Sequence, residues 1–562
     1  MHCVRTVTDH LYWVGANDHR LHLFENIHPI PRGVSYNAYL LLDEKSVLFD
    51  TVDWSACRQL LENIAYLLDS KPLDYLVINH MEPDHGASIE EILLRYPQVK
   101  IISTEKAFLL MRQFGFHVDG HECIEVKEGD TYTFGAHTVT FVAAPMVHWP
   151  EAMVTFDVTN GALFSADAFG SFIALDGKLF ADEVNFDRDW IDEARRYLTN
   201  IVGKYGPHIQ LLLKKAGGIL DQIKFICPLH GPVWRKDFLY FIDKYDKWSR
   251  YEPEVQGVML AYASMYGNTE AAAQALAAKL CERGVTDVAL YDVSNTHVSY
   301  LISEAFKYSH IVLASVTYNL GIYPVMHNLL MDMKALNLQN RTFALIENGS
   351  WACKSGDLMQ KFIDEELKNM TVLNERLTLA SSLHKSKAAE LDALPDPIVE
   401  SMKKPLSCRP IPQSGRGRRH THPAPSIVPA QPSRPVSSSY SSRVSLSAAK
   451  KTSSFSPRPW VWPRSMRRFN VRYSISRPPL FSYSAVRPSS SSVSRYSWST
   501  SRASASSCGV GASSSSGRRT AVRAVRTPSS SVSSQEPPQA NACSARCSGT
   551  SAHPSPIQLD VR

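Results

Sequence analysis

Two histidines and two carboxylates occupy six consecutive positions of the segment "NHMEPDHG", as His80, Glu82, Asp84 and His85. They follow directly on the apolar run "YLVIN", which is typical of a buried strand, so their side chains should leave from a loop at the end of that strand. Imidazole and carboxylate groups are common metal ligands. The segment therefore predicts a metal site, and it raises the question of why a glutamate stands between the histidines.

Three further candidate ligands stand at the ends of other predicted strands. His148 lies in "APMVHWPE" between two strands, Asp167 closes "GALFSAD", and His230 closes "FICPLHG". A single histidine after a strand is more often an ordinary core or loop residue, and "PDHG" could simply cap a helix that starts near Ala87. Ligands from several strand ends can, however, converge on one edge of a sheet. We therefore predict one site built from all seven residues.

The composition of this set predicts two metal ions. Four imidazoles and three carboxylates exceed what one tetrahedral zinc ion uses. A carboxylate that can bridge, such as Asp167, suits two ions a few ångströms apart. Hard oxygen ligands mixed with imidazole favour iron or manganese. A redox-active pair is therefore favoured over a hydrolytic pair.

Residues 1–252 are predicted to form one layered α/β domain, because short β-branched runs alternate with helical patterns. The expected strands are "AYLLLDEKSVLFDTV" as a hairpin, "LDYLVINH", "VKIIST", "HTVTFVAA" paired with "AMVTFDV", "GALFSAD" and "QIKFICPLH". The expected helices include "ACRQLLENIAYLL" and "GASIEEILLRYP".

Residues 253–402 are predicted to form a second domain. The strand "GVMLAYAS", the helix "AAAQALAAKLCERG" and the strands "HIVLASVTYN" and "TFALIENGSWA" alternate as in a doubly wound parallel sheet. The helical pattern "SKAAELDALPDPIVESM" closes the unit.

Three polar loops of this second domain lie at predicted strand ends, where doubly wound sheets bind ligands. The first, "SMYGNTE", precedes a helix, so its backbone N–H groups could cradle a phosphate. It has neither the lysine of a Walker A loop nor the glycines of a dinucleotide fingerprint, which favours a mononucleotide. The alternative is a simple helix cap. The loops "SVTYNLG" and "ENGSWA" favour the ligand site.

Residues 403–562 are a different kind of sequence. They carry 25 Lys and Arg against two acidic residues, a net charge of +23, whereas residues 1–402 carry −17. This Ser-, Arg- and Pro-rich composition predicts a disordered tail. Binding of nucleic acid, with Trp460, Trp462 and Trp498 stacking on bases, is an alternative that no recognisable module supports. We favour the hypothesis that a shifted reading frame near residue 405 scrambled a third domain.

Targeting features are not apparent in the sequence. The start lacks a signal peptide and no apolar run reaches the roughly 20 residues of a membrane helix. The ten cysteines include no CxxC pair. We expect a soluble, cytoplasmic protein that does not act at a membrane.

The metal motif resembles that of a known family. The order H-x-E-x-D-H, followed by His, Asp and His, is similar to the metallo-β-lactamase-type domain of the flavodiiron proteins (A-type flavoproteins), whose hydrolytic relatives carry H-x-H-x-D-H. Residues 23–53 also resemble that family. The resemblance implies an αβ/βα sandwich and a non-haem diiron centre. It implies that His80, Glu82 and His148 hold one iron, that Asp84, His85 and His230 hold the other, and that Asp167 bridges both.

The three loops of the second domain resemble the flavodoxin segments that bind FMN, so FMN is the implied cofactor. Trp351 is a candidate aromatic wall for the flavin ring, with packing in a core as the alternative. The implied flavin contacts are Ser264, Met265, Tyr266, Gly267, Asn268, Thr269, Thr317, Tyr318, Asn319, Gly321, Asn348, Gly349, Ser350, Trp351 and Ala352.

The resemblance implies an oxidoreductase that reduces dioxygen to water, nitric oxide to nitrous oxide, or both, with FMN relaying electrons to the irons. It implies a donor such as rubredoxin or a flavin/NAD(P)H reductase. It also implies a head-to-tail homodimer, or a dimer of dimers, in which the FMN of one subunit lies beside the irons of the other. Two alternatives stay open: a metallo-β-lactamase-fold zinc hydrolase, and an electron-transfer flavoprotein with an inactive metal domain.

Overall fold

A computed structural model of the chain describes residues 2–403. The predictions made for residues 404–562, including the disordered tail, the shifted reading frame and the stacking of Trp460, Trp462 and Trp498, lie outside the described residues. Within residues 2–403, no helix is both long and apolar enough to cross a membrane. The six cysteines in this range are free thiols.

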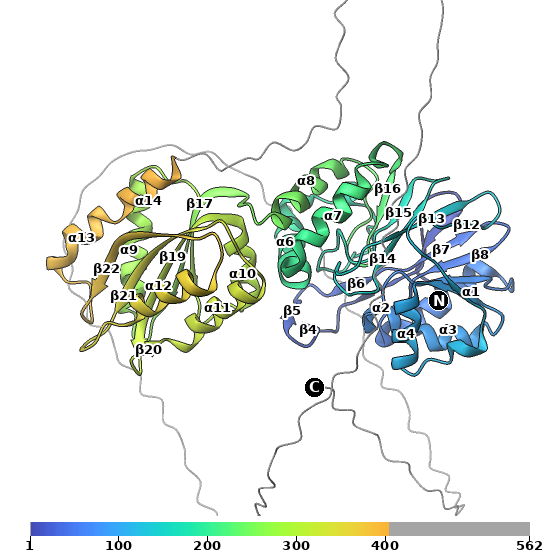
Figure 1. Cartoon of the computed structure of the whole chain (residues 1–562), viewed down its shortest axis with the longest axis horizontal. Coiled ribbons are helices and arrows are strands. Elements are labelled where there is room, and N and C mark those ends of the chain that lie inside the picture. Colours follow the sequence, from blue (N-terminus) through green and yellow to red (C-terminus); the bar gives the residue numbers. More distant parts are fainter. Residues whose placement is uncertain (1, 404–562) are drawn as a thin grey trace, which may run out of the picture. The chain divides into compact units, whose positions relative to one another are not determined.

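The N-terminal domain contains two β-sheets that lie between helices (Figure 1). The first sheet has the order β1-β2-β7-β8-β9-β10-β11, and the second has the order β12-β13-β14-β15-β16. The strands of the first sheet are Arg5–Thr6, Leu11–Trp13, Tyr39–Leu42, Ser46–Phe49, Tyr75–Val77, Lys100–Ser103 and Cys123–Glu125. Those of the second sheet are Thr131–Thr133, Thr138–Ala143, Met153–Asp157, Ala162–Phe164 and Phe225–Cys227.

Helices cover the outer faces of the two sheets. Figure 1 shows α1 to α4 on one side of the domain and α6 to α8 on the other. The helices α1 to α4 are Cys57–Leu68, Pro83–Gly86, Ile89–Arg95 and Glu105–Gln113. The helices α5 to α8 are Phe186–Asp189, Ile191–Tyr197, Gly206–Ala216 and Phe238–Ser249. This arrangement confirms the predicted αβ/βα sandwich.

Pairing within the sheets agrees with the sequence pattern. Strands β7 and β8 form the expected antiparallel hairpin, and β13 pairs antiparallel with β14. Strands β9 and β10 are parallel, as are β15 and β16. Two small antiparallel pairs, which the sequence did not suggest, are β3 (Ala16–Asp18) with β6 (Val34–Tyr36), and the hairpin of β4 (Leu23–Phe24) with β5 (His28–Pro29).

The second domain is a parallel sheet of order β18-β17-β19-β21-β22, with the short β20 paired to β19. This is the 2-1-3-4-5 order of flavodoxin-like sheets, so the predicted doubly wound fold is confirmed. The strands β17 to β22 are Val255–Ala263, Val288–Asp292, Tyr308–Tyr318, Gly321–Ile322, Thr342–Asn348 and Thr371–Leu379. The helices α9 to α14 are Asn268–Glu282, Val298–Lys307, Pro324–Ala335, Ser355–Glu366, Ala388–Ala393 and Pro395–Met402.

Alternate residues of the central strands bury against different helices, as the period of two along a strand requires. Met259 and Ala261 of β17 pack in one core with residues of α10, α11 and α12. Val258 and Leu260 pack in a second core with residues of α9, α13 and α14. Two-sided burial explains why β17, β19 and β21 are nearly continuous apolar runs. The predicted domain limits at residues 252 and 402 remain predictions.

Candidate metal centre and flavin site

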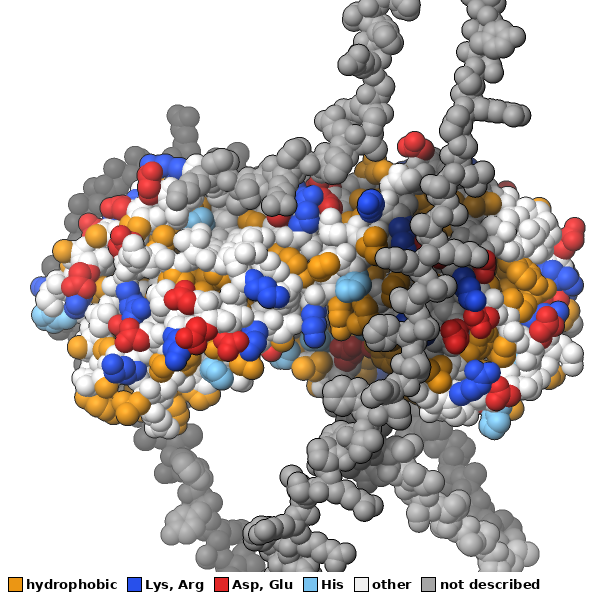
Figure 2. All heavy atoms as spheres, viewed as in Figure 1, with side chains coloured by type: hydrophobic (Ala, Val, Ile, Leu, Met, Phe, Trp, Pro, Cys, Tyr) orange, Lys and Arg blue, Asp and Glu red, His pale blue; other side chains and the backbone are white. Residues whose placement is uncertain are grey.

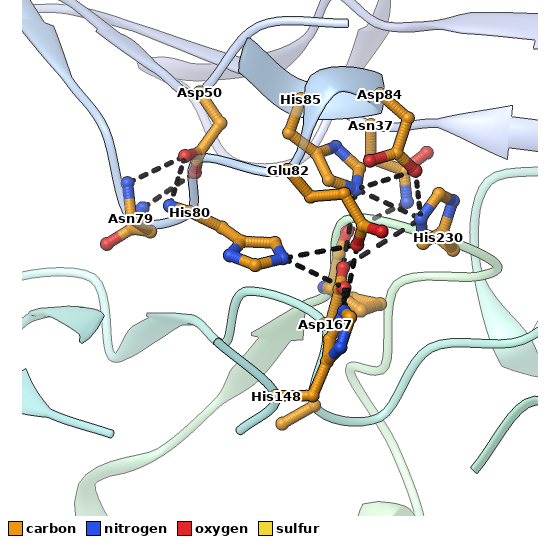
Figure 3. Close-up of polar contacts among 12 residues, drawn as sticks. Asn37, Asp50, Asn79, His80, Glu82, Asp84, His85, His148, Asp167 and His230 are labelled. Atoms are coloured by element: carbon orange, nitrogen blue, oxygen red, sulfur yellow. Dashed lines mark hydrogen bonds and ion pairs between the residues drawn. The ribbon is translucent and has the colours of Figure 1, made fainter. Parts of the chain in front are cut away.

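Seven side chains converge beside the C-terminal ends of strands β9, β15 and β16 (Figure 3). Their ligand atoms form two groups, and within each group all atoms lie within 4.8 Å of one another. The first group is His80, Glu82, His148 and Asp167, and the second is Asp84, His85 and His230. The structure therefore brings together all seven residues that the sequence nominated.

Asp167 lies between the two groups and turns one carboxylate oxygen toward each. Its Oδ2 lies 3.3 Å from Nε2 of His80 and 3.1 Å from Nε2 of His148. Its Oδ1 lies 3.3 Å from Nε2 of His85 and 3.8 Å from Nε2 of His230. This is the placement that a carboxylate bridging two metal ions needs.

Each half of the centre adds one carboxylate and two imidazoles to Asp167. In the first half, Oε2 of Glu82 lies 2.8 Å from Nε2 of His148. In the second half, Oδ2 of Asp84 lies 3.1 Å from Nε2 of His230. Nε2 of His85 lies only 2.9 Å from Nε2 of His230. Two imidazole nitrogens that face each other this closely, beside carboxylates, are suited to hold a cation.

The ionisable groups of the site are strongly coupled. Burial is the largest single influence on His80 and lowers its pKa, but the negative charge of Asp167 and the hydrogen bonds to Asp167, Glu151 and Glu82 together raise this pKa well above its usual value. Burial likewise opposes the charged form of His148, whose hydrogen bonds to Asp167 and Glu82 raise its pKa to about 9. Without a metal, protonated imidazoles therefore supply the positive charge that these carboxylates require.

The loop that carries His80 is held by a buried carboxylate at the end of the neighbouring strand β8. Asp50, directly after β8, accepts hydrogen bonds from the backbone N–H of Asn79 at 2.7 Å, from the Asn79 side-chain amide at 2.7 Å and from the backbone N–H of His80 at 3.3 Å (Figure 3). These bonds fix the turn from β9 into α2, from which four of the seven side chains project.

The imidazoles are oriented through their other nitrogens. Nδ1 of His80 donates to Oε1 of Glu151 at 3.0 Å, which leaves Nε2 facing Asp167. Nδ1 of His230 donates to the backbone carbonyl of Ser35 at 2.7 Å. The Ser35 hydroxyl in turn accepts from the backbone N–H of Gly231 at 2.8 Å. Partners of this kind hold ligand rings in the orientation that a metal requires.

A tyrosine that sequence reasoning missed borders the second half of the centre. The Tyr197 ring lies 5.4 Å from the His230 ring, and its hydroxyl is buried without a hydrogen-bond partner among the described residues. Burial and the charge of Asp167 both raise the pKa of this phenol well above its usual value. A Cβ added at Gly170 would lie 2.6 Å from the Tyr197 ring, so the glycine makes room for it.

Three supporting residues, Asp50, Glu151 and Tyr197, were therefore not found from the sequence. Their contacts join positions far apart in the chain, and the local sequence around each gives no pattern that separates it from an ordinary buried residue. The donor set itself fits a pair of iron ions, because it mixes hard carboxylate oxygens with imidazole nitrogens.

A cavity of about 300 Å³ opens beside the C-terminal ends of β17, β19 and β21. Thirteen of the fifteen residues predicted to contact flavin line it, and Gly267 and Gly321 do not. Val316, Leu320 and Ser381 also line the cavity and were not predicted. Ser381 follows β22, a strand that the sequence analysis did not identify, so its loop was missed as well.

The loops around this cavity are shaped by short-range contacts. In the first loop the backbone N–H of Gly267 donates to Oγ of Ser264 at 3.1 Å, and Gly267 has a positive φ of 83° that favours glycine. In the third loop a Cβ at Gly349 would lie 2.2 Å from the carbonyl oxygen of Ala352, so only glycine fits. Trp351 is 92% exposed and therefore does not pack in a core.

Comparisons with known proteins agree with both domains. Residues 34–231 match the family described as "ODP family beta lactamase", and residues 260–380 match the flavodoxin family. The chain is 34% identical over 363 residues to a nitric oxide reductase of Moorella thermoacetica, covering 64% of this chain and 89% of the relative. It is 32% identical over 360 residues to a rubredoxin-oxygen oxidoreductase of Megalodesulfovibrio gigas, covering 64% and 88%.

Solved structures show the same architecture. Rubredoxin oxygen:oxidoreductase from Desulfovibrio gigas superposes with a TM-score of 0.66 at 28% identity, covering 71% of this chain and 98% of that one. The flavodiiron protein from Giardia intestinalis gives a TM-score of 0.67 at 23% identity, covering 71% and 98%, which supports the fold.

The fold and the two sites define an oxidoreductase in which a β-lactamase-like metal domain precedes an FMN-binding flavodoxin domain. With the relatives above, the chain belongs to the flavodiiron proteins. The family carries a diiron centre together with FMN, and the group of His, Asp and Glu side chains in this chain fits the diiron centre.

Proposed function

We propose that this protein reduces dioxygen to water, nitric oxide to nitrous oxide, or both, at a diiron centre that receives electrons through FMN. The observation that carries the proposal is Asp167, whose two oxygens each face a separate group of ligands. The names of the relatives, nitric oxide reductase and rubredoxin-oxygen oxidoreductase, support both gases as substrates.

Two irons and FMN, when bound, supply the electrons and the site of gas binding. We propose that His80, Glu82 and His148 hold one iron, that Asp84, His85 and His230 hold the other, and that Asp167 bridges them. The contacts of 2.8 to 3.4 Å between carboxylate oxygens and imidazole nitrogens within each half support this division. Glu82 supplies a hard oxygen where hydrolytic relatives have histidine, which favours iron over zinc.

We propose that Tyr197 acts as a hydrogen-bond donor on the second half of the centre. Its buried hydroxyl has no partner among the described residues, and a buried donor without a partner is costly unless a ligand or water completes it. Its high pKa keeps the phenol protonated at neutral pH, so it can donate to an oxygen of the bound substrate.

We also propose that FMN occupies the cavity at the ends of β17, β19 and β21, with its phosphate at the Ser264–Glu270 loop. The fifteen flavin contacts named from the sequence stand as this proposal. The start of α9 directly after Gly267 supports it, because the first N–H groups of a helix attract phosphate.

The rim of this cavity supports a dimer in which a second copy covers the flavin. Leu320, Tyr266 and Trp351 are 65%, 89% and 92% exposed, and Figure 2 shows hydrophobic side chains gathered at the end of this domain where β20 lies in Figure 1. Exposed apolar groups of this size commonly mark an interface. We propose the head-to-tail homodimer, alone or as a dimer of dimers.

The electron donor is proposed to be rubredoxin or a flavin/NAD(P)H reductase, which the name of the Megalodesulfovibrio gigas relative supports. We place the protein in the cytoplasm, in keeping with the free thiols of the described cysteines. Binding of nucleic acid is not proposed.

Metal and flavin analysis combined with gas consumption tests the function. The full chain, purified without oxygen, should contain two irons and one FMN per chain, and should consume dioxygen or nitric oxide when a reductase supplies electrons. A colourless protein that holds zinc would favour the hydrolase. A protein with bound FMN that consumes neither gas would favour the electron-transfer alternative.

A further inference from the structure

We infer that Glu151 makes the two halves of the metal centre unequal, so that the half with His80, Glu82 and His148 holds its iron at the lower reduction potential. This inference rests on the proposed diiron centre and deepens it. Glu151 is a positioning residue in this account, because it acts on a metal through His80.

The contact is direct and buried. Oε1 of Glu151 accepts a hydrogen bond from Nδ1 of His80 at 3.0 Å and a second one from the backbone N–H of Met81 at 2.9 Å. The side chains of His80 and Glu151 are both fully buried. The other carboxylate oxygen of Glu151, Oε2, is buried without a partner among the described residues. The carboxylate is therefore not neutralised by any Lys or Arg of the described chain within an ion-pair distance.

In the other half of the centre, no imidazole donates its Nδ1–H to a carboxylate among the described residues. Nδ1 of His230 donates to a neutral backbone carbonyl, that of Ser35. Nδ1 of His85 is buried and has no partner among the described residues. A hydrogen bond to a carboxylate is roughly twice as strong as one between neutral groups, so only His80 gains a strong increase in basicity.

A more basic imidazole donates more electron density through Nε2 and stabilises the ferric state relative to the ferrous state. When one equivalent of a chemical oxidant such as ferricyanide takes one electron from the fully reduced pair, the ferric ion should therefore form in the His80 half. His148 and Glu151 lie on the same loop between β13 and β14. This loop therefore provides one metal ligand and also the carboxylate that makes the other imidazole of the same half, His80, more basic.

The test is a redox titration of the iron-loaded full chain, followed by the low-temperature EPR signal of the half-oxidised iron pair. Glu151→Gln keeps the shape and removes the charge. It should raise the lower of the two potentials and leave the upper one unchanged. The separation between the two potentials should therefore narrow by about 59 mV. For one electron this corresponds to about a tenfold fall in the equilibrium constant for forming the half-oxidised pair from the fully reduced and fully oxidised pairs. Glu151→Asp, which keeps the charge, should restore most of this separation.

Thr104→Val is the matched control. The Thr104 hydroxyl donates to the backbone carbonyl of Glu151 at 3.2 Å, so this change disturbs the same loop without touching the carboxylate. Both potentials should stay as in the wild type. An unchanged separation in Glu151→Gln, an equal shift of both potentials, or the same narrowing in Thr104→Val overturns the inference.

Metal retention provides a second measurement. If Glu151→Gln does not hold both irons, one iron per chain should remain, because the half with Asp84, His85 and His230 does not depend on Glu151. Loss of both irons overturns the inference. A wild-type protein without an iron pair overturns the proposed function itself. An intact iron pair whose two potentials are the same in the wild type and in Glu151→Gln overturns only this inference.

Discussion

Metal binding should release protons, because the metal-free centre holds protonated imidazoles in the places where metals bind. The pKa of His148 is about 9, and that of His80 lies well above its usual value. Both rings are therefore charged at pH 7.5 in the metal-free protein. In each ring Nε2 is the atom that faces Asp167, so a metal must displace the proton on that atom.

The expected size of the effect follows from this count. Loading of the metal pair should release about two protons at pH 7.5, and somewhat more at lower pH because the pKa of His230 is raised as well. Since a raised pKa means that protons compete with metal below that pKa, affinity must rise with pH. The overall binding constant should increase about tenfold per displaced proton per pH unit, or about 100-fold from pH 7 to 8.

Isothermal titration of the metal-free full chain with Co²⁺ measures this release without redox chemistry. Repeating the titration in buffers of different ionisation enthalpy gives the number of protons at each pH. The release should fall as the pH rises through about 9, because His148 loses its proton across that range before any metal binds. His148→Gln, which cannot be protonated, should lower the release by about one proton. A binding constant that is flat between pH 7 and 8 would refute the electrostatic description of the site.

Three substitutions test other parts of the account. Asp167→Asn should abolish gas reduction with flavin absorbance unchanged, because it weakens the bridge but leaves the second domain intact; retained turnover would contradict the bridging role. Tyr197→Phe should slow turnover while unfolding experiments show equal stability or a gain of about 1 kcal/mol, because the lost hydroxyl has no partner among residues 2–403; full turnover would argue against hydrogen bonding to substrate. Gly349→Ala should weaken FMN binding at least about tenfold in a fluorescence titration, since the added Cβ would lie 2.2 Å from a backbone oxygen, and iron content should not change; unchanged FMN affinity would show that this loop does not enclose the flavin.

The central elements of the fold were predictable because burial on one or both faces leaves a clear pattern. Strands β17, β19 and β21 are buried on both faces and appear in the sequence as apolar runs between helical segments. The edge strands β18 and β22 were missed. Strand β18, "VALYD", is a half-buried run of only five residues, and β22, "TVLNERLTL", carries polar residues on its exposed positions that resemble a loop. Missing β22 also hid the Ser381 side of the flavin cavity.

The metal ligands were predictable for a different reason. Each one is a His, Asp or Glu in a loop that follows a predicted strand or connects two of them, and together they resemble one family motif. The residues that support these ligands, such as Glu151, have no local sequence pattern that distinguishes them from ordinary buried residues. Glu151 lies 71 positions from His80 and meets it only because β9 and the loop before β14 come together in the folded chain. Contacts of this kind depend on packing between sheets, which a single sequence does not reveal.

Anaerobic stopped-flow mixing tests the central claim most directly. The full chain, with iron and FMN quantified and then fully reduced, is mixed with dioxygen or with nitric oxide while the flavin absorbance is recorded. The account predicts that the reduced FMN is oxidised rapidly by at least one of the gases, with formation of water or nitrous oxide, and that Asp167→Asn removes this rapid phase while keeping its FMN. Flavin oxidation at the same rate in the wild type and in Asp167→Asn, or none with either gas, would contradict it.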